Sequence, residues 1–330
     1  MNRKSLLVWH RRIALALAPL FLLQAVTGLF LLIPPPALAI TSGPALPPSA
    51  LVAGAMRAAP GFRAFRLDYS PDAPVVARMT NAAGERVFVA IDPATGHVLD
   101  SGSLWHDPWR IAQEWHNSLF SGVIGSTLVA LEAIALLALA ISGIIFWWPG
   151  KGRLRQGLSI PARAPKRLKL RLWHRSTGVA ASALLAMMAV TGLLLVWPLI
   201  VPPAAGPFLG DPARTDPAPM LDVAYARAAL PGQSLSDIRL APSGHATFHF
   251  AARTGNHWYL DTVTIEPDGR PRITRGTDAP ELWMRLLPLH TGDALGIFGQ
   301  ILIALVGGAL LFLTISGVIA WNRARKGKSK

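Results

Sequence analysis

The sequence predicts a mainly α-helical membrane protein with four transmembrane helices, arranged as two parallel repeats of span, outer module and span. Each outer module is expected to be a small α+β unit. The 330-residue chain is 52% hydrophobic and only 15% charged, which is too apolar for an average soluble domain. Four apolar stretches are long enough to cross a bilayer core of roughly 30 Å. Long strings of sequence also recur at a fixed displacement along the chain.

The four apolar stretches cover approximately residues 13–33, 123–148, 176–197 and 297–321. The first imitates a cleaved signal peptide, because basic residues precede it and the string ALA at 37–39 looks like a peptidase site. Its apolar run exceeds the usual signal core of about 7–15 residues, and an internal copy follows later in the chain. We therefore expect this stretch to be retained as a span.

The basic residues of this chain, which has a net charge of +14, lie mainly before the first stretch, between the second and third, and after the fourth. These are the segments that an even-spanning protein leaves in the cytoplasm. The positive-inside rule therefore predicts both termini and the 149–172 loop inside, and residues 34–115 and 199–289 outside. The charge is interpreted as a topology signal, with membrane lipid and not nucleic acid as the neighbour.

Two strings carry the internal repeat. WHRRIALALAPLFLLQAVTGLFLLIP at 9–34 returns as WHRSTGVAASALLAMMAVTGLLLVWP at 173–198, displaced by 164 positions. HNSLFSGVIG at 116–125 matches HTGDALGIFG at 290–299, displaced by 174, and the same offset relates the ISG string at 141–143 to its copy near the C-terminus. Since each copy begins and ends inside, the copies are parallel repeats related by an axis along the membrane normal.

Each outer segment begins with a Pro-rich linker and a short helical stretch, at 51–59 and at 221–230. Alternating runs separated by turn residues follow and predict short strands. The predicted strands are 62–69, 74–80, 85–92 and 97–101 in the first module, and 236–242, 245–251, 257–266 and 271–276 in the second.

These patterns divide the chain into eight consecutive parts. They are 1–34, N-terminus and first span; 35–112, first module; 113–149, second span; 150–172, basic loop; 173–198, third span; 199–286, second module; 287–321, fourth span; and 322–330, basic tail.

Four histidines occupy equivalent places in the two repeats. His10 and His174 lie at the inner ends of the first and third spans, and His116 and His290 at the outer ends of the second and fourth. Two imidazoles related by a pseudo-twofold axis can bind a planar macrocycle from its two faces, so each pair predicts a bis-histidine site for haem b. The alternative is that the Trp-His pairs are interfacial anchors.

Two glycines share a helix face with the inner histidines. Gly28 and Gly192 each follow His10 or His174 by 18 residues, which is five turns, or about 27 Å, of a straight helix. Small residues there let a second flat ring approach near the outer surface, so both glycines are candidate cofactor contacts. Close helix packing is the alternative explanation.

Glu132 stands inside the second predicted span, where the equivalent position of the other repeat is Val306. An intramembrane carboxylate suggests a proton-handling or pairing role. Hydrogen bonding to a neighbour such as Gln24 or Gln300 explains it equally well.

Five other histidines lie outside the repeat pattern, and three of them belong to the second outer module. His245 and His249 share one face of a predicted strand, and His257 begins the next. They form a candidate external patch for a metal or substrate, or else solvent-exposed histidines on a small sheet.

Several chemistries are excluded. The chain has no cysteine, which rules out disulfides, thiolate catalysis, iron–sulfur clusters and covalent haem attachment. No GxGxxG or P-loop string opens a helix after a strand, so no flavin or nicotinamide site is expected, and neither HExxH nor GxSxG is present. Any redox chemistry therefore needs an electron donor.

The WHR…AVTGL span, the DPATG turn, the EWHNSL re-entry and the ISGIIFWWP exit resemble the PepSY-associated transmembrane family over nearly the whole chain. Members include bacterial inner-membrane ferric-siderophore reductases, in which histidines of the spans hold haem and PepSY-type modules face the periplasm. Carried over, the resemblance implies axial haem ligation by His10, His116, His174 and His290, and a location in the inner membrane. The chain departs from such enzymes in having four predicted spans and no cytoplasmic reductase domain.

The expected function is electron transfer from a cytoplasmic or membrane donor, through two haems, to a ferric complex or siderophore in the periplasm; the reductase activity follows from the resemblance. A second hypothesis is a membrane-anchored PepSY module that binds or regulates a protein partner without a cofactor. A third, iron or proton transport, calls for more mid-membrane polar residues than Glu132 alone.

Overall fold

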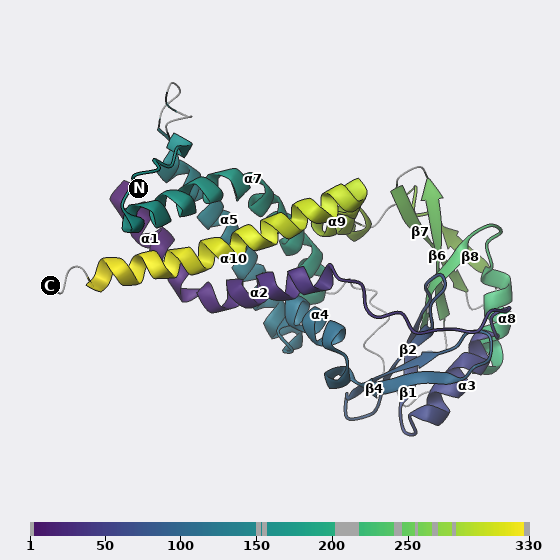
Figure 1. The fold of residues 1–330 in the computed structure, drawn as a ribbon. Coiled ribbons are helices and arrows are strands. Elements are labelled where there is room, and N and C mark those ends of the chain that lie inside the picture. Colours follow the sequence, from purple (N-terminus) through teal and green to yellow (C-terminus); the bar gives the residue numbers. More distant parts are fainter. Residues whose placement is uncertain are drawn as a thin grey trace. The chain divides into compact units, whose positions relative to one another are not determined.

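The computed structural model forms two compact units, which we call the helical unit and the sheet unit (Figure 1). The helical unit comprises Met1–Pro34, Ala112–Pro202 and Leu286–Lys330, and the sheet unit comprises Pro35–Ile111 and Pro203–Arg285. The residues that the structure describes are 3–149, 153, 157–201, 218–240, 246–254, 257–265, 270–278 and 282–326.

The helical unit consists of long apolar helices. Its elements are α1 (Arg3–Ala16), α2 (Ala18–Leu31), α4 (Pro108–Ser118, whose first turn lies in the sheet unit), α5 (Gly122–Trp147), α7 (Lys166–Ile200), α9 (Leu282–Thr291) and α10 (Gly296–Lys326). Among the described residues, three segments are long and apolar enough to cross a membrane: Gly122–Trp147, Leu168–Ile200 and Asp293–Arg325. A fourth crossing exists if α1 and α2 together make one span.

The first predicted span is not the straight helix expected over 13–33. α1 and α2 meet at Leu17 with a bend of 60°. Pro19 lies in the first turn of α2, and its ring removes an N–H and clashes with the carbonyl four residues earlier, which breaks a continuous helix. Four spans therefore remain a prediction.

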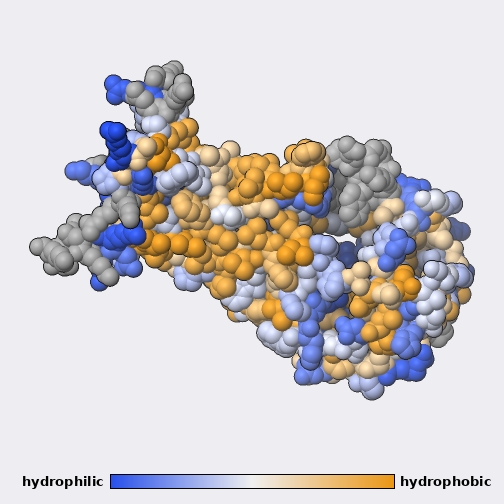
Figure 2. All heavy atoms as spheres, viewed as in Figure 1, coloured by the Kyte–Doolittle hydropathy of each residue, from blue (hydrophilic) through white to orange (hydrophobic). Residues whose placement is uncertain are grey.

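The outer surface of the helical unit is apolar. Large hydrophobic side chains stand exposed on α5 and α10, among them Ile124 at 72%, Leu305 at 66% and Phe298 at 79%. Figure 2 shows hydrophobic residues over the visible face of this unit, with hydrophilic residues gathered near the N-terminus. Contiguous exposed apolar surface of this extent suits contact with lipid and is unusual in a soluble monomer.

The sheet unit has a helix and four strands from each predicted module. Its elements are α3 (Pro48–Ala58), β1 (Arg63–Asp68), β2 (Val75–Thr80), β3 (Arg86–Ile91), β4 (Val98–Ser103), α8 (Ala218–Ala228), β5 (Ser234–Leu240), β6 (Ala246–Thr254), β7 (His257–Ile265) and β8 (Pro271–Thr274). All eight strands lie where the alternating runs predict them.

The sequence predicts two separate modules, but their strands form one antiparallel sheet of order β4-β3-β2-β1-β5-β6-β7-β8. β1 pairs with β5 through Arg66 and Arg239, Leu67 and Ile238, and Asp68 and Asp237. An isolated module would leave the edge of its first strand with unpaired backbone groups. The pairing of β1 with β5 satisfies both edges.

One face of the sheet carries the hydrophobic core. α3 and α8 lie on this face (Figure 1) and contribute Leu51, Val52 and Leu221 to a cluster with strand residues such as Leu67 and Phe248. The alternation of the strands places Leu67 in the core and its neighbours Arg66 and Asp68 on the opposite face. The opposite face is therefore polar at its centre.

Candidate functional site

The inner pair, His10 and His174, has the same local construction in both repeats. The Nδ1 atom of His10 in α1 lies 2.7 Å from Ser142 Oγ in α5. The Nδ1 atom of His174 in α7 lies 2.8 Å from Ser316 Oγ in α10. Both histidines belong to the helical unit. Their pairing around one ligand stays a prediction from the repeat.

The outer pair repeats this construction with threonines. His116, near the end of α4, has Nδ1 3.2 Å from Thr27 Oγ1 in α2. His290, in α9, has Nδ1 2.8 Å from Thr191 Oγ1 in α7. The two imidazole rings lie in an edge-to-face arrangement, with centroids 6.3 Å apart and planes at 64°.

The hydroxyl partners favour one tautomer of the four imidazoles. Each hydroxyl group has one proton, and each has a backbone carbonyl of its own helix within reach as an acceptor: Ser142 has Leu139, Ser316 has Leu313, Thr27 has Leu23 and Gln24, and Thr191 has Met187 and Met188. When the proton goes to the carbonyl, the hydroxyl oxygen can only accept from the imidazole, and Nδ1 then carries the hydrogen. In that tautomer the lone pair of Nε2 is available to bind a metal.

A glycine follows each of these hydroxyl residues and makes room for the ring. A Cβ atom added at Gly28 would lie 3.0 Å from His116 Cε1, and one at Gly192 would lie 3.2 Å from His290 Cε1. At the inner histidines there is more space. A Cβ atom added at Gly317 would lie 3.4 Å from His174 Cε1, and one added at Gly143 would lie 3.9 Å from His10 Cε1. Gly28 and Gly192, predicted as cofactor contacts, therefore seat the outer histidines directly.

Sequence reasoning identified the four histidines and two of the glycines but missed the hydroxyl residues. The signal was present, because Thr27 and Thr191 belong to the repeated AVTGL string, and Ser142 and Ser316 to the repeated ISG string. A His–Ser contact across 132 positions is invisible to local spacing.

Glu132 is buried in α5, at 5% exposure, and both of its carboxylate oxygens lack a hydrogen-bond partner within the described structure. Neither neighbour considered from sequence supplies one. The amide of Gln24 donates to the carbonyl of His116 over 2.7 Å, and that of Gln300 donates to Asp293 over 2.8 Å. The hydrogen-bonding explanation for Glu132 does not hold.

Of the three histidines in the predicted external patch, only His249 has a side chain within the described residues. His249 is only 4% exposed, and its Nδ1 lies 3.0 Å from Asp237 Oδ1. His245 and the side chain of His257 lie outside the described residues. Within the described ranges, no group of three or more His, Cys, Asp or Glu residues can hold a metal ion.

Asp237 is the buried centre of the polar sheet face. Burial alone raises the pKa of this carboxyl, but the hydrogen bond from His249 and the charges of His249, Arg66 and Arg239 outweigh it. The resulting pKa is about 2, below the ordinary 3.8. Asp237 is therefore an ionised carboxylate at neutral pH.

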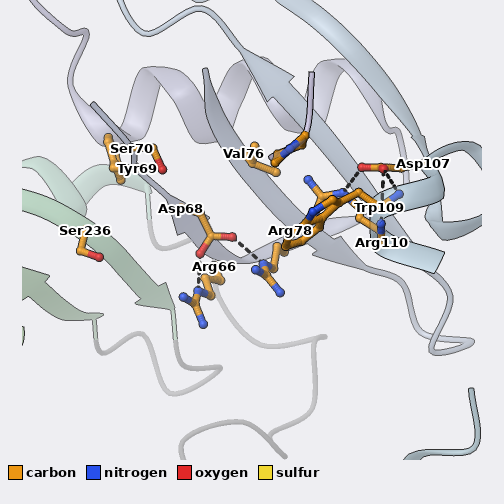
Figure 3. A pocket seen from close by; sticks show the side chains of 11 residues that line it. Arg66, Asp68, Tyr69, Ser70, Val76, Arg78, Asp107, Trp109, Arg110 and Ser236 are labelled. Atoms are coloured by element: carbon orange, nitrogen blue, oxygen red, sulfur yellow. Dashed lines mark hydrogen bonds and ion pairs between the residues drawn. The ribbon is translucent and has the colours of Figure 1, made fainter. Parts of the chain in front are cut away.

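A pocket opens on the polar side of the sheet, within the sheet unit (Figure 3). It has a volume of about 330 Å³ and is lined chiefly by Arg66, Asp68, Arg78, Trp109 and Arg110. Sequence reasoning did not single out these residues, because their proximity depends on the strand register.

Comparison with protein-family models gave a match to the family described as the PepSY-associated TM region, over residues 3–324. A search of curated proteins gave no match. The matched range includes all four histidines of the inner and outer pairs.

Proposed function

The chain belongs to the PepSY-associated TM region family, and on this premise we propose that it binds two b-type haems and transfers electrons across the membrane to a ferric complex. The observation that carries the proposal is the shared construction of the four histidines. Each has its Nδ1 within hydrogen-bond distance of a hydroxyl oxygen, and Nε2 is the remaining nitrogen for a metal when Nδ1 carries the proton. A hydrogen bond of this kind fixes the ring and raises the basicity of the ligating nitrogen.

The residues fit a haem better than a bare metal ion. Two imidazoles bound to one metal through bonds of about 2 Å have ring centroids roughly 6 Å apart, and the outer rings lie 6.3 Å apart. Within the described residues no third His, Asp or Glu completes a protein-only metal site. A macrocycle supplies the remaining ligands itself, so two histidines are sufficient.

His10 and His174 would hold one haem and His116 and His290 the other. A haem held this way supplies reversible one-electron transfer at a potential set by its axial ligands and its burial. The four histidines are partly buried among the helices, and the hydroxyl partners would hold the ligand rings in place. No nucleotide motif is present in the sequence, so the donor is a separate molecule.

We propose further that the protein lies in a bacterial inner membrane, with α1 and α2 together forming the fourth span. The basic segments favour cytoplasmic termini and a periplasmic sheet unit. The inner pair then lies on the side of the donor, and the outer pair on the side of the acceptor. Reduction of ferric iron weakens its binding by hard-oxygen chelators. The choice of a ferric or ferric-siderophore acceptor is supported by the resemblance of the span motifs to such reductases.

The first test is the absorption spectrum of the detergent-purified protein, oxidised and then reduced with dithionite, with a pyridine haemochrome assay. We expect two b-type haems per chain. His10→Ala and His290→Ala should each remove one haem, whereas His97→Ala, at an exposed turn of the sheet unit, should keep both. Colourless protein from haem-replete cells would contradict the proposal and favour the cofactor-free regulatory anchor.

A further inference from the structure

Three arginines form a row across neighbouring strands on the polar face of the sheet. Arg66 of β1 lies directly opposite Arg78 of β2 on one side and opposite Arg239 of β5 on the other. Like charges directly opposite each other on adjacent strands destabilise a sheet. Such a departure from the pairing rules is expected where a site serves function.

Two aspartates contact this row in the described part of the chain. Asp68 accepts from Arg66 Nε and from Arg78 Nε, each over 2.5 Å. Asp237 contacts Arg239 Nε at 2.9 Å and Arg66 Nη2 at 3.4 Å. These three arginines and two aspartates together carry a formal net charge of +1.

A fourth guanidinium extends the row. Arg110 stacks on Phe88, with 4.1 Å from its Cζ to the ring centroid, and Phe88 lies opposite Arg78 in the sheet. Asp107 accepts from Arg110 Nε over 2.9 Å and from the backbone N–H of Trp109 over the same distance. The pair of Asp107 and Arg110 has no net charge. It therefore holds Arg110 and Trp109 at the pocket and leaves the net positive charge of the arginine row unchanged.

Arg78 contacts Asp68 through Nε. Arg66 contacts Asp68 through Nε and Asp237 through Nη2. Their side chains are 32% and 29% exposed and line the pocket with Trp109 and Arg110 (Figure 3). A guanidinium carries five N–H donors in a planar fork that matches the two oxygens of a carboxylate. The pocket therefore offers charge and donors to an oxyanion.

We propose that this pocket binds a small molecule bearing several carboxylates. Its volume of about 330 Å³ lies at the small end of ligand sites, which cover roughly 300–1,000 Å³. The identification of this molecule as the chelator of the ferric substrate rests on the proposed function. The protein then prefers anionic ferric chelates to neutral ones.

Equilibrium dialysis of the full-length protein in detergent against ferric citrate, with radiolabelled iron, tests the proposal. Arg66→Gln and Arg78→Gln keep a polar side chain but shorten it and remove the charge, and each should weaken binding by roughly tenfold. Arg63→Gln, on the exposed start of the same strand β1 and outside the pocket, should bind like the wild type. Arg78→Lys keeps the positive charge and loses the paired N–H donors of the guanidinium, so intermediate binding is expected. This variant also tests the pocket if a glutamine variant fails to fold.

Three results would each overturn the proposal: undetectable binding of ferric citrate, equal binding by the wild type and both glutamine variants, or equal binding of a neutral ferric trihydroxamate. Displacement of ferric citrate by an equal concentration of inorganic phosphate would also overturn it, because the site would then be a general oxyanion site. Haem is counted on the same samples. If ferric citrate binds through the arginines but the protein contains no haem, the electron-transfer function is refuted and the carboxylate pocket stands. If the protein contains haem but does not bind ferric citrate, the carboxylate pocket is refuted and the electron-transfer function stands.

Discussion

His290 Nδ1 lies 2.8 Å from Thr191 Oγ1, a hydroxyl that donates its own proton to the backbone carbonyl of Met187, also over 2.8 Å. The hydroxyl therefore acts on the imidazole as an acceptor, and the imidazole keeps its proton on Nδ1. Three other histidines of the helical unit have the same arrangement. Histidines that bind a metal usually have such a partner on the other ring nitrogen, so haem binding is the property that tests these contacts.

Thr191→Val should loosen the outer haem site while leaving the inner site intact. Valine has nearly the shape of threonine but accepts no hydrogen bond, so His290 loses the partner that fixes its tautomer. Loss of such a partner typically lowers metal affinity by about 10–100-fold. Haem titration of the apoprotein measures the change, and Thr191→Ser, which keeps the hydroxyl, is the control. Equal affinity in the valine variant would show that the contact has no role in ligation.

Gly28→Ala should displace His116 and reduce the haem content from two to one per chain. The added Cβ would lie 3.0 Å from His116 Cε1, closer than normal packing allows, so the ring must shift. Gly308→Ala in α10 is the matched control, because its added Cβ meets nothing within 4 Å. Pyridine haemochrome counts compare the two variants. A full haem complement in Gly28→Ala would mean that the ring tolerates the shift.

The repeat in the sequence was sufficient to predict the histidine pairs, because two offsets align every member with its counterpart. It could not predict the hydroxyl partners, since each contact joins positions at least 89 apart on different helices. The bend at Leu17 was also missed, although Pro19 was a visible signal. A proline in the first turn of a helix suits its start as well as it suits a kink, so its position alone does not separate the two.

The strands were predictable from alternation, but the joining of the two modules was not. Alternation fixes which side chains share a face and leaves open which edges pair. The arginine row exists only because β1 lies between β2 and β5 in a register that sets Arg66 opposite Arg78 and Arg239. A shift of one residue would place these side chains in the core.

Glu132→Val should stabilise the protein. The carboxylate is buried at 5% exposure without a hydrogen-bond partner in the described structure, and a buried unsatisfied polar group costs about 1–3 kcal/mol. Valine has a similar volume and is the residue at the equivalent position 306 of the other repeat. Thermal unfolding in detergent should show a higher Tm for Glu132→Val and a lower Tm for the reciprocal Val306→Glu. A lower Tm for Glu132→Val would show that the carboxylate has a stabilising partner.

Asp237 should make the sheet unit sensitive to acid. Its pKa is about 2 in the folded protein and 3.8 ordinarily. Because the folded value is the lower one, its stabilisation is complete above pH 3.8 and is lost as the pH falls through 2. The difference corresponds to about 2 kcal/mol, and the side chain is only 2% exposed, so solvent screens it little.

Asp237→Asn removes the titrating group and should therefore flatten this part of the pH dependence, although the variant starts from a lower stability because Arg66, Arg239 and His249 lose their common carboxylate. Urea unfolding of the full-length protein, followed by circular dichroism of the sheet between pH 5 and pH 2, measures both effects. Asp100→Asn, at an exposed position on β4, controls for the general loss of an acidic group. Parallel pH profiles for the wild type and Asp237→Asn would place the acid sensitivity elsewhere in the chain.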